Sequence, residues 1–174
     1  WSSDVCSSDL MNVVAVSSDA ENRPGWAHPG ERAKILNRFR DWDPEVKGAI
    51  GAVAEWSVWS LFDRQERPSW GTHNVTLLGD AAHPVLPFLA QGAALAIEDA
   101  ATLAKDIMAT PNDVTGALRR YEAKRRPRVT RVQDASRANG RISHLRWPLT
   151  KARNFVMART DLSKRYDWLY SFVI

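Results

Sequence analysis

Asp80 and Gly92 bracket a stretch whose residue types could bind a cofactor. Residues 74–79 form a short apolar run that predicts a buried strand, and Asp80 follows directly at its C-terminal end. Gly92 comes after a loop that contains Pro84 and Pro87, and it opens a long apolar helix. Ligands of α/β sheets bind at the carboxyl ends of strands, and helix N-termini favour electron-rich or anionic groups. The strand, the carboxylate and the helix therefore predict a cofactor site.

Two long helices are predicted after this loop. The apolar pattern predicts the first over residues 91–109, and Pro111 ends it. The second begins near residue 114, where Pro127 either interrupts it or begins a new segment. Residues 139–140, Asn-Gly, are expected to form its C-cap.

The elements before the loop are shorter. They are predicted as a strand, a loop, two helices and a second strand, over residues 12–16, 17–30, 31–41, 43–53 and 55–63. Asp43 is expected to cap the second of these helices, with Pro44 in its first turn. At the other end of the chain, Pro148 is expected to divide residues 142–174 into shorter helical pieces.

The composition excludes several classes of protein. Apolar residues make up 44% of the chain and charged residues 25%, as in an ordinary soluble globular protein. A single cysteine, Cys6, excludes an internal disulfide framework and fits a reducing compartment, so we expect a cytoplasmic protein. No apolar run approaches the roughly 20 residues that span a bilayer, and the N-terminus does not resemble a signal peptide, so no membrane partner is expected. With four histidines and no paired ligand spacing, no metal site is expected.

The run from Gly79 to Ala100, GDAAHPVLPFLAQGAALAIEDA, resembles the second flavin-binding motif of single-component FAD-dependent aromatic hydroxylases. The resemblance is to the salicylate hydroxylase and 6-hydroxynicotinate monooxygenase group. Gly-Asp, Ala-Ala-His-Pro, a second proline seven residues beyond the aspartate, Gln-Gly and Glu-Asp-Ala occur in order at the family's spacing. LFDRQERPSW before the motif, and YEAKRRPRVTRVQDASRANGRISHL and YDWLY after it, look like the same family.

The resemblance implies a role for each residue of the motif. Asp80 would accept a hydrogen bond from the ribityl chain of FAD. Gly92, Ala93 and Ala94 would present backbone N–H groups to the N1–C2=O end of the flavin, where the reduced ring carries negative charge. Pro87 would lie beside the ring and shape the substrate cavity. The remaining expected cofactor contacts are Gly79, Ala82 and Gln91.

Trp56 and Arg64 lie on or after the strand that leads to this site. They are candidates for lining the substrate cavity, with packing in the core as an equal alternative. No residue is assigned as the catalytic base.

Three ionisable residues of the motif are expected to be structural. His83, next to a proline, is interpreted as a hydrogen-bonding residue and not as a base. Glu98 and Asp99 are adjacent on a helix, so they diverge and are not expected to form a carboxylate dyad. They are expected to pair with cations of the following helix, such as Arg125 or Arg126.

Residues 119–153 are strongly basic, with 12 Lys or Arg and two acidic residues. Such a stretch can bind nucleic acid, but it has no reader motif and no glycine-aromatic interleaving. A solvated helical face, or one that attracts NAD(P)H, is the favoured interpretation, and no nucleic-acid partner is expected.

The resemblance implies that NADH or NADPH reduces FAD and that O2 supplies the oxygen atom transferred to a small hydroxylated aromatic acid similar to salicylate. The family's N-terminal G-x-G-x-x-G motif and its Asp-Gly motif do not occur in this chain. We therefore expect the C-terminal part of a two-domain FAD-binding monooxygenase fold, of α/β class and α+β within this chain, with few strands followed by long helices.

The domain organisation expected from this comparison has three parts. Residues 1–10, which contain SSD twice, look like a non-native flank. Residues 11–73 would be the end of the substrate-domain sheet and helices, and residues 74–174 the C-terminal part of the FAD-binding domain with a helical tail. The alternatives are a catalytically inactive fragment, or a basic helical module that binds an anionic partner. A homodimer is one further arrangement that we consider.

Overall fold

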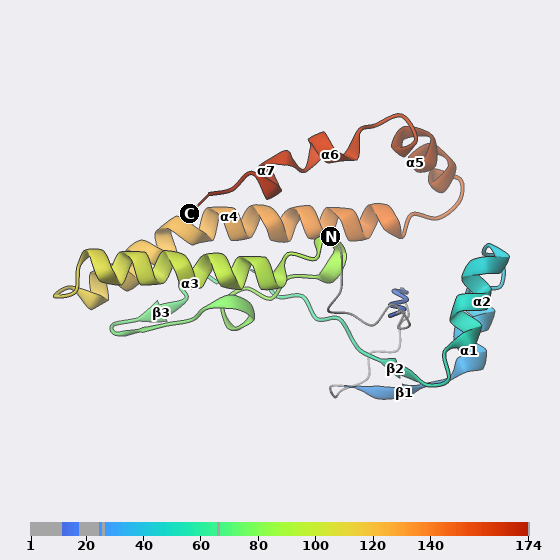
Figure 1. Cartoon of the computed structure of the whole chain (residues 1–174), viewed down its shortest axis with the longest axis horizontal. Coiled ribbons are helices and arrows are strands. Elements are labelled where there is room, and N and C mark those ends of the chain that lie inside the picture. Colours follow the sequence, from blue (N-terminus) through green and yellow to red (C-terminus); the bar gives the residue numbers. More distant parts are fainter. Residues whose placement is uncertain (1–11, 18–24, 26, 66, 174) are drawn as a thin grey trace, which may run out of the picture. The chain divides into compact units, whose positions relative to one another are not determined.

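The computed structural model describes residues 12–17, 25, 27–65 and 67–173 of the chain (Figure 1). The chain divides into two compact units, Trp1–Leu61 and Phe62–Ile174. The expected flank at residues 1–10 lies outside the described residues. The domain division expected between residues 73 and 74 concerns a larger protein and stays a prediction.

The first unit combines a two-stranded antiparallel sheet with two helices. β1 (His28–Gly30) pairs with β2 (Trp56–Val58), and α1 (Arg32–Arg38) and α2 (Pro44–Ala52) lie between them in the sequence. Asp43 accepts a hydrogen bond of 2.9 Å from the backbone N–H of Glu45, so the predicted helix cap is confirmed.

The sheet of the first unit differs from the prediction in two ways. The predicted loop over residues 17–30 ends in a strand, and the strand predicted over residues 55–63 is reduced to the three residues of β2. Gly30 allows the two strands to approach, because a Cβ atom there would lie 2.8 Å from the Cβ of Trp56. The glycine and proline of β1 signal a loop in the sequence, whereas here they accommodate a close strand pair.

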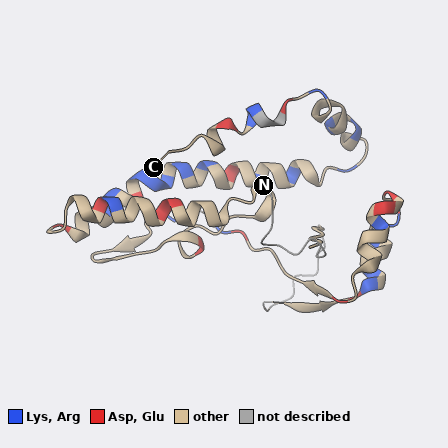
Figure 2. Cartoon of the chain, viewed as in Figure 1, with Lys and Arg blue, Asp and Glu red and all other residues tan. Residues whose placement is uncertain are grey.

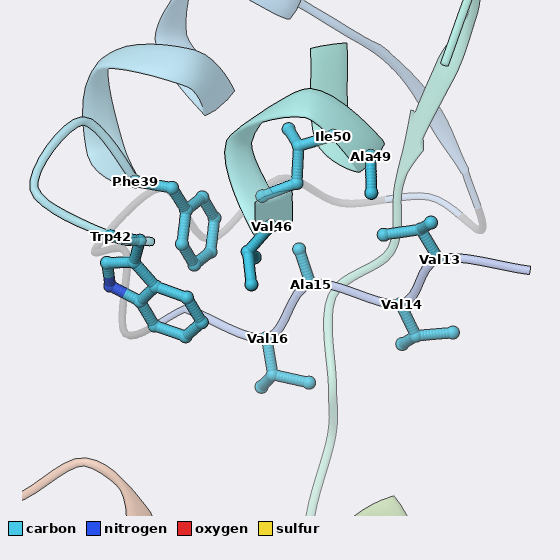
Figure 3. A pocket seen from close by; sticks show the side chains of 9 residues that line it. All are labelled: Val13, Val14, Ala15, Val16, Phe39, Trp42, Val46, Ala49 and Ile50. Atoms are coloured by element: carbon cyan, nitrogen blue, oxygen red, sulfur yellow. The ribbon is translucent and has the colours of Figure 1, made fainter. Parts of the chain in front are cut away.

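The strand predicted at residues 12–16 is wrong. In the described part of the chain these residues pair with no strand. Val13 to Val16 instead line a pocket of about 160 Å³ beside α1 and α2 (Figure 3). The other side of that pocket is formed by Val46, Ala49 and Ile50 of α2 and by Phe39 and Trp42 of the turn between α1 and α2. β-Propensity reflects packing within a sheet, so a valine run without a partner strand packs on helices instead.

The second unit is organised around two long helices, α3 (Gly92–Ala109) and α4 (Val114–Ser143), which lie side by side (Figure 1). The predicted first helix is thus confirmed, with Gln91 as its N-cap residue. The hydrophobic core of this unit contains Trp70, Ala82, Leu95, Tyr121, Val129, Val132 and Leu169. The predicted pattern of few strands followed by long helices is confirmed.

The predicted interruption at Pro127 does not occur, because α4 continues through it as one helix of 30 residues. Proline removes one backbone hydrogen bond to the residue four positions earlier. Here that residue is Ala123, and both positions are exposed, so water can satisfy the freed carbonyl. The predicted C-cap at residues 139–140 is also wrong, since the helix ends at Ser143.

The segment before α3 contains little regular strand. β3 (Gly71–Thr72) and β4 (Val75–Thr76) form a short antiparallel hairpin, and Val75 is 63% exposed. The buried strand predicted over residues 74–79 is therefore wrong within the described residues. A strand buried on both faces needs neighbours on both sides, and β3 is the one strand that pairs with β4 here.

Three short helices end the second unit: α5 (Leu149–Met157), α6 (Leu162–Arg165) and α7 (Asp167–Tyr170). Pro148 precedes α5, as predicted. Arg128 and Arg131 of α4 lie over the rings of Phe172 and Trp168, at 3.9 and 3.8 Å from the ring centroids. These contacts attach the C-terminal segment to α4.

The basic residues of α4 are conspicuous in the charge distribution (Figure 2). Many of them bind within the unit and do not form the solvated face that was expected. Arg119 donates to the backbone carbonyls of Gly71 and Val75, at 2.6 and 3.0 Å, and so attaches the hairpin to α4. Arg120 forms an ion pair with Asp113 at 3.1 Å.

Among the described residues, no helix combines the length and the apolar character needed to cross a membrane.

Candidate functional site

Gly79 begins the turn that carries Asp80. Its φ angle of +57° lies in the left-handed region, and a Cβ atom there would lie 3.2 Å from the Cβ of Ala96 on α3. Glycine is favoured on both grounds. The chain then forms a single 3-10 turn, η1 (Gly79–Ala81), which packs against α3. This close approach brings Asp80 to the α3 helix.

Asp80 and the N-terminus of α3 converge, as the sequence predicts. The Asp80 side chain is exposed. Its Oδ1 lies 3.9 Å from the position that a Cβ atom on Gly92 would occupy. One carboxylate acceptor and the first turn of a helix are therefore adjacent on one surface.

The first turn of α3 offers unused hydrogen-bond donors. Leu95 N–H makes the first backbone bond of the helix, to Gln91 O at 2.9 Å. The N–H groups of Gly92, Ala93 and Ala94 precede it, and the first turn of a helix supplies no carbonyl partners for such groups. Within the described structure, Gln91 makes no side-chain cap to them. They are available to an acceptor on a ligand, and the helix dipole favours negative charge there.

Three side chains of α4 hold the loop between Asp80 and α3. They donate to the carbonyls of alternate loop residues: Gln133 to Pro84 at 2.9 Å, Ser136 to Leu86 at 2.6 Å, and Asn139 to Phe88 at 2.7 Å. We call these three side chains the α4 ladder. Pro87, which opens the 3-10 turn η2 (Pro87–Leu89), remains exposed. The loop thus leaves Pro87 exposed, and its expected role beside the substrate cavity stays a prediction.

Gly140 of α4 completes the support of this loop. A Cβ atom at Gly140 would lie 2.6 Å from Cε2 of Phe88, so only glycine lets the ring lie directly on the helix. This contact explains why a glycine occurs inside a long helix, where it disfavours the helical state by about 1 kcal/mol.

Two other predicted cofactor contacts are buried. Ala82 is 3% exposed and its methyl group belongs to the hydrophobic core. Gln91 is 8% exposed, and its amide donates to Leu89 O at 3.4 Å. Both side chains therefore support the site from the interior of the protein.

The two candidate substrate-cavity residues are placed differently. Arg64 donates to the carbonyls of Ala81 and Ala82 at 2.9 and 3.1 Å, directly after Asp80. Trp56 belongs to β2 of the first unit, where it is half-buried opposite Gly30. Its role in a substrate cavity stays a prediction.

A buried charge cluster lies behind the site. Asp99 is fully buried and accepts hydrogen bonds from Gly79 N–H at 3.0 Å, His83 Nε2 at 2.5 Å and Arg125 Nε at 2.6 Å. Arg125 also pairs with Glu98 at 2.7 Å. The predicted pairing of both carboxylates with Arg125 and the predicted hydrogen-bonding role of His83 are confirmed.

The cluster controls the ionisation of its carboxylates. Burial by itself would raise the pKa of Asp99, but the hydrogen bonds from His83, Arg125 and Gly79 outweigh it, and the pKa lies below its ordinary value. The pKa of Glu98 is lowered in the same way, since bonds from Arg128 and Arg125 outweigh its burial. Both groups are carboxylates at neutral pH, which suits a structural ion pair and not a proton-transfer role.

The sequence prediction missed the α4 ladder. Its residues recur at three-residue intervals in RVQDASRANG, where small and polar residues interrupt an apolar helical face. Three polar residues on a buried helical face need partners, and this signal could have identified them.

The family comparison agrees with this geometry. A family model described as "FAD binding domain" matches residues 6–136. The chain belongs to this family. The resemblance to FAD-dependent aromatic hydroxylases predicted from the motif is also confirmed by the named relatives.

The relatives are aromatic-acid monooxygenases. The chain is 40% identical over 165 residues to the 3-amino-4-hydroxybenzoate 2-monooxygenase PtmB3 of Streptomyces platensis, covering 94% of this chain and 42% of that protein. It is 32% identical over 172 residues to the salicylate hydroxylase of Pseudomonas putida, covering 93% and 39%. This chain therefore spans about two-fifths of the length of these relatives.

Solved structures give the same result. A salicylate hydroxylase substrate complex superposes with a TM-score of 0.69 at 26% identity, over 94% of this chain and 40% of that one. FqzB superposes with a TM-score of 0.63 at 28% identity, over 79% and 33%. The described fold is thus found within these larger solved structures.

Removing one hydrogen bond of the α4 ladder should make the loop that carries Pro87 more mobile. Ser136→Ala leaves the carbonyl of Leu86 without its donor, so we expect a loss of about 1–3 kcal/mol in the free energy of unfolding. Amide hydrogen exchange across residues 84–89 should accelerate. The matched control is Ser143→Ala at the exposed end of the same helix, which should stay within about 0.5 kcal/mol of the unaltered chain. Equal effects of the two substitutions would contradict the ladder.

Asp99 should contribute to stability above pH 4 and lose that contribution in acid. Its folded pKa lies below the ordinary value of 3.8, so the unfolded chain takes up the proton first as the pH falls. Asp99→Asn should lower the free energy of unfolding at pH 7 by about 1–3 kcal/mol, because the buried donors of Arg125 and Gly79 lose their charged acceptor while Arg125 keeps its ion pair with Glu98.

Denaturant titrations between pH 7 and 2 check this expectation. The variant should show a flatter loss of stability below pH 4 than the unaltered chain. Asp41→Asn, whose side chain is 86% exposed, is the control and should retain the full acid dependence. An unchanged slope in Asp99→Asn would refute the assignment.

Proposed function

We propose that this chain forms the flavin-ring half of the FAD site of an aromatic monooxygenase that uses NADH or NADPH and O2. The observation that carries the proposal is the convergence of the Asp80 carboxylate on the uncapped N-terminus of α3. A flavin offers hydroxyl donors on its ribityl chain and an electron-rich N1–C2=O edge on its ring. The site offers one acceptor and a row of N–H donors, so the residues present fit this cofactor.

Each residue then has the role that the resemblance implies, and its placement supports that role. Asp80 accepts from a ribityl hydroxyl, and the N–H groups of Gly92, Ala93 and Ala94 donate to the ring edge. Gly79 makes the turn that carries Asp80. Gln91 and Ala82 support the site from the buried side, and Pro87 borders the substrate.

FAD, when bound, supplies the electron transfer and the activation of oxygen. The protein holds the ring and the substrate and excludes water from them. Because Glu98 and Asp99 are held as ion pairs behind the site, we do not assign the proton transfer to them.

The substrate that we propose is a small hydroxylated aromatic acid. The support comes from the relatives, which are named for 3-amino-4-hydroxybenzoate, 3-hydroxybenzoate and salicylate. Each name describes a benzene ring with a carboxylate and a hydroxyl group. The expectation that Trp56 and Arg64 lie near this substrate comes from their position on or after the strand that leads to the site.

We further propose that the chain is the C-terminal part of a longer cytoplasmic protein. The chain spans about two-fifths of the length of its relatives, and it lacks the glycine-rich motif that binds the adenosine half of FAD. In this protein, residues 11–73 would end the substrate domain and residues 74–174 would complete the FAD-binding domain. A homodimer is compatible with this arrangement.

The alternative of a basic helical module has less support. Arg119, Arg125, Arg128 and Arg137 of α4 make hydrogen bonds within the second unit. Their charges are therefore largely committed to folding.

The test is FAD binding by the complete protein, meaning the longest expressed form that carries this chain. Asp80→Ala should weaken FAD binding about 10-fold to 100-fold, the equivalent of one hydrogen bond to a charged group. Quenching of flavin fluorescence on titration measures the dissociation constant. Asp167→Ala on the exposed face of α7 is the control and should leave the constant unchanged.

Two outcomes would contradict the proposal. The first is a complete protein that carries no flavin absorbance and gains none when FAD is added. The second is an Asp80→Ala variant that binds FAD as tightly as the unaltered protein. Retention of FAD without NAD(P)H oxidation in the presence of hydroxybenzoates would favour the inactive-fragment alternative.

A further inference from the structure

Arg64 is bound to the backbone that directly follows Asp80. Its Nη2 atom donates to the carbonyls of Ala81 and Ala82, at 2.9 and 3.1 Å. The guanidinium is half-buried, and its Nε atom is buried. A charged donor shared by two consecutive carbonyls holds the direction of the chain at that point.

Arg64 is itself held in place from α4. Arg137 binds both carboxylate oxygens of Asp63, through Nε at 2.7 Å and Nη2 at 3.0 Å, and Nη2 also donates to the carbonyl of Arg64 at 3.0 Å. The hydrogen bond from Arg137 holds the pKa of Asp63 below its ordinary value, so the pair is charged at neutral pH. Residues 63–64 are therefore anchored to the same helix that carries the ladder.

The turn that carries Asp80 is thus held at both ends. At its beginning, Gly79 N–H donates to the buried carboxylate of Asp99 at 3.0 Å. At its end, the carbonyls of Ala81 and Ala82 accept from Arg64. Asp80 lies between these two anchors and is exposed, so its direction depends on both of them.

We propose that Arg64 is a positioning residue for the flavin site, and that the Asp63–Arg137 ion pair holds Arg64 for this purpose. Arg64 acts through the backbone of residues 81–82 on the direction of the Asp80 carboxylate relative to the N-terminus of α3. This inference rests on the proposed function, because Asp80 is taken to bind the flavin. It replaces the expectation that Arg64 contacts the aromatic substrate.

The two roles of Arg64 predict different measurements. An arginine that binds the substrate carboxylate changes the KM for the aromatic acid and leaves FAD binding without substrate unchanged. A positioning arginine changes the affinity for FAD and the visible circular dichroism of the bound flavin when no substrate is present. The measurements are therefore made first on the substrate-free complete protein.

The variants are Arg64→Gln, Arg64→Lys, Arg137→Gln and the double variant Arg64→Gln with Arg137→Gln. Arg64→Gln should raise the dissociation constant for FAD about 10-fold and change the visible circular dichroism. Arg64→Lys, which keeps a charged donor, should restore part of the affinity. Arg137→Gln should weaken FAD binding less than Arg64→Gln does. Because Arg137 acts through Arg64, the double variant should bind FAD no more weakly than Arg64→Gln alone.

The control is Arg159→Gln, whose guanidinium lies over the exposed ring of Phe155 and which should leave both signals unchanged. Unchanged FAD affinity and dichroism in Arg64→Gln, with only the KM for the aromatic acid raised, would overturn the inference and leave the proposed function intact. If Arg64→Gln does not fold, Arg64→Lys and Arg137→Gln take its place. Unchanged FAD affinity and unchanged dichroism in both of these variants would overturn the positioning role of Arg64. If the unaltered complete protein binds no FAD, the proposed function fails and the inference fails with it.

Discussion

Asp99 accepts hydrogen bonds from three different segments while it is fully buried. Gly79 N–H comes from the turn before Asp80, His83 from the loop after it, and Arg125 from α4. A buried carboxylate is costly unless it is paired and hydrogen-bonded. The three segments must therefore meet at this point for the fold to be stable. The ion pair between Asp99 on α3 and Arg125 on α4 thus also determines the position of Asp80 on the surface.

The long helix α4 extends this control over the whole site. Its 30 residues form a rod of about 45 Å. Along it, Arg119 holds the hairpin, Arg125 holds Asp99, and the ladder holds the loop that carries Pro87. Ligand-binding residues commonly lie on loops that a rigid element positions. Here the loop residues are the proposed ligand contacts, whereas the side chains that hold the loop lie on one helix.

The sequence was informative where the chemistry is local. The start of α3 at Gly92 and the pairing of Asp99 with Arg125 follow from residue types and helical spacing, and the structure places both as expected. Asp80 lies at the N-terminus of α3 as expected, but a 3-10 turn and not a strand carries it there. The predicted cofactor contacts themselves stay predictions. The family motif indicates that these contacts are made to the flavin-ring part of FAD.

Strand predictions failed because a strand is defined by its partner. The apolar runs at residues 12–16 and 74–79 have the composition of strands. The first packs on helices without a partner strand, and the second pairs with β3 over Val75–Thr76, where Val75 stays exposed. Pro127 did not break α4, because its lost hydrogen bond faces water while Arg125 and Val129 nearby are buried. The contacts of the α4 ladder and of Arg64 were not predicted for another reason. Their acceptors are backbone carbonyls 17 to 51 residues away, and a carbonyl has no signature in the sequence.

The central claim is that Asp80 and the first turn of α3 bind the same ligand. The most direct measurement is the chemical shift of the backbone amides of Gly92, Ala93 and Ala94 as FAD is added to the complete protein. These signals and that of Asp80 should shift together, with one dissociation constant, and Asp80→Ala should weaken the response at all of them. FAD binding that leaves the signals of residues 92–94 unchanged would contradict it.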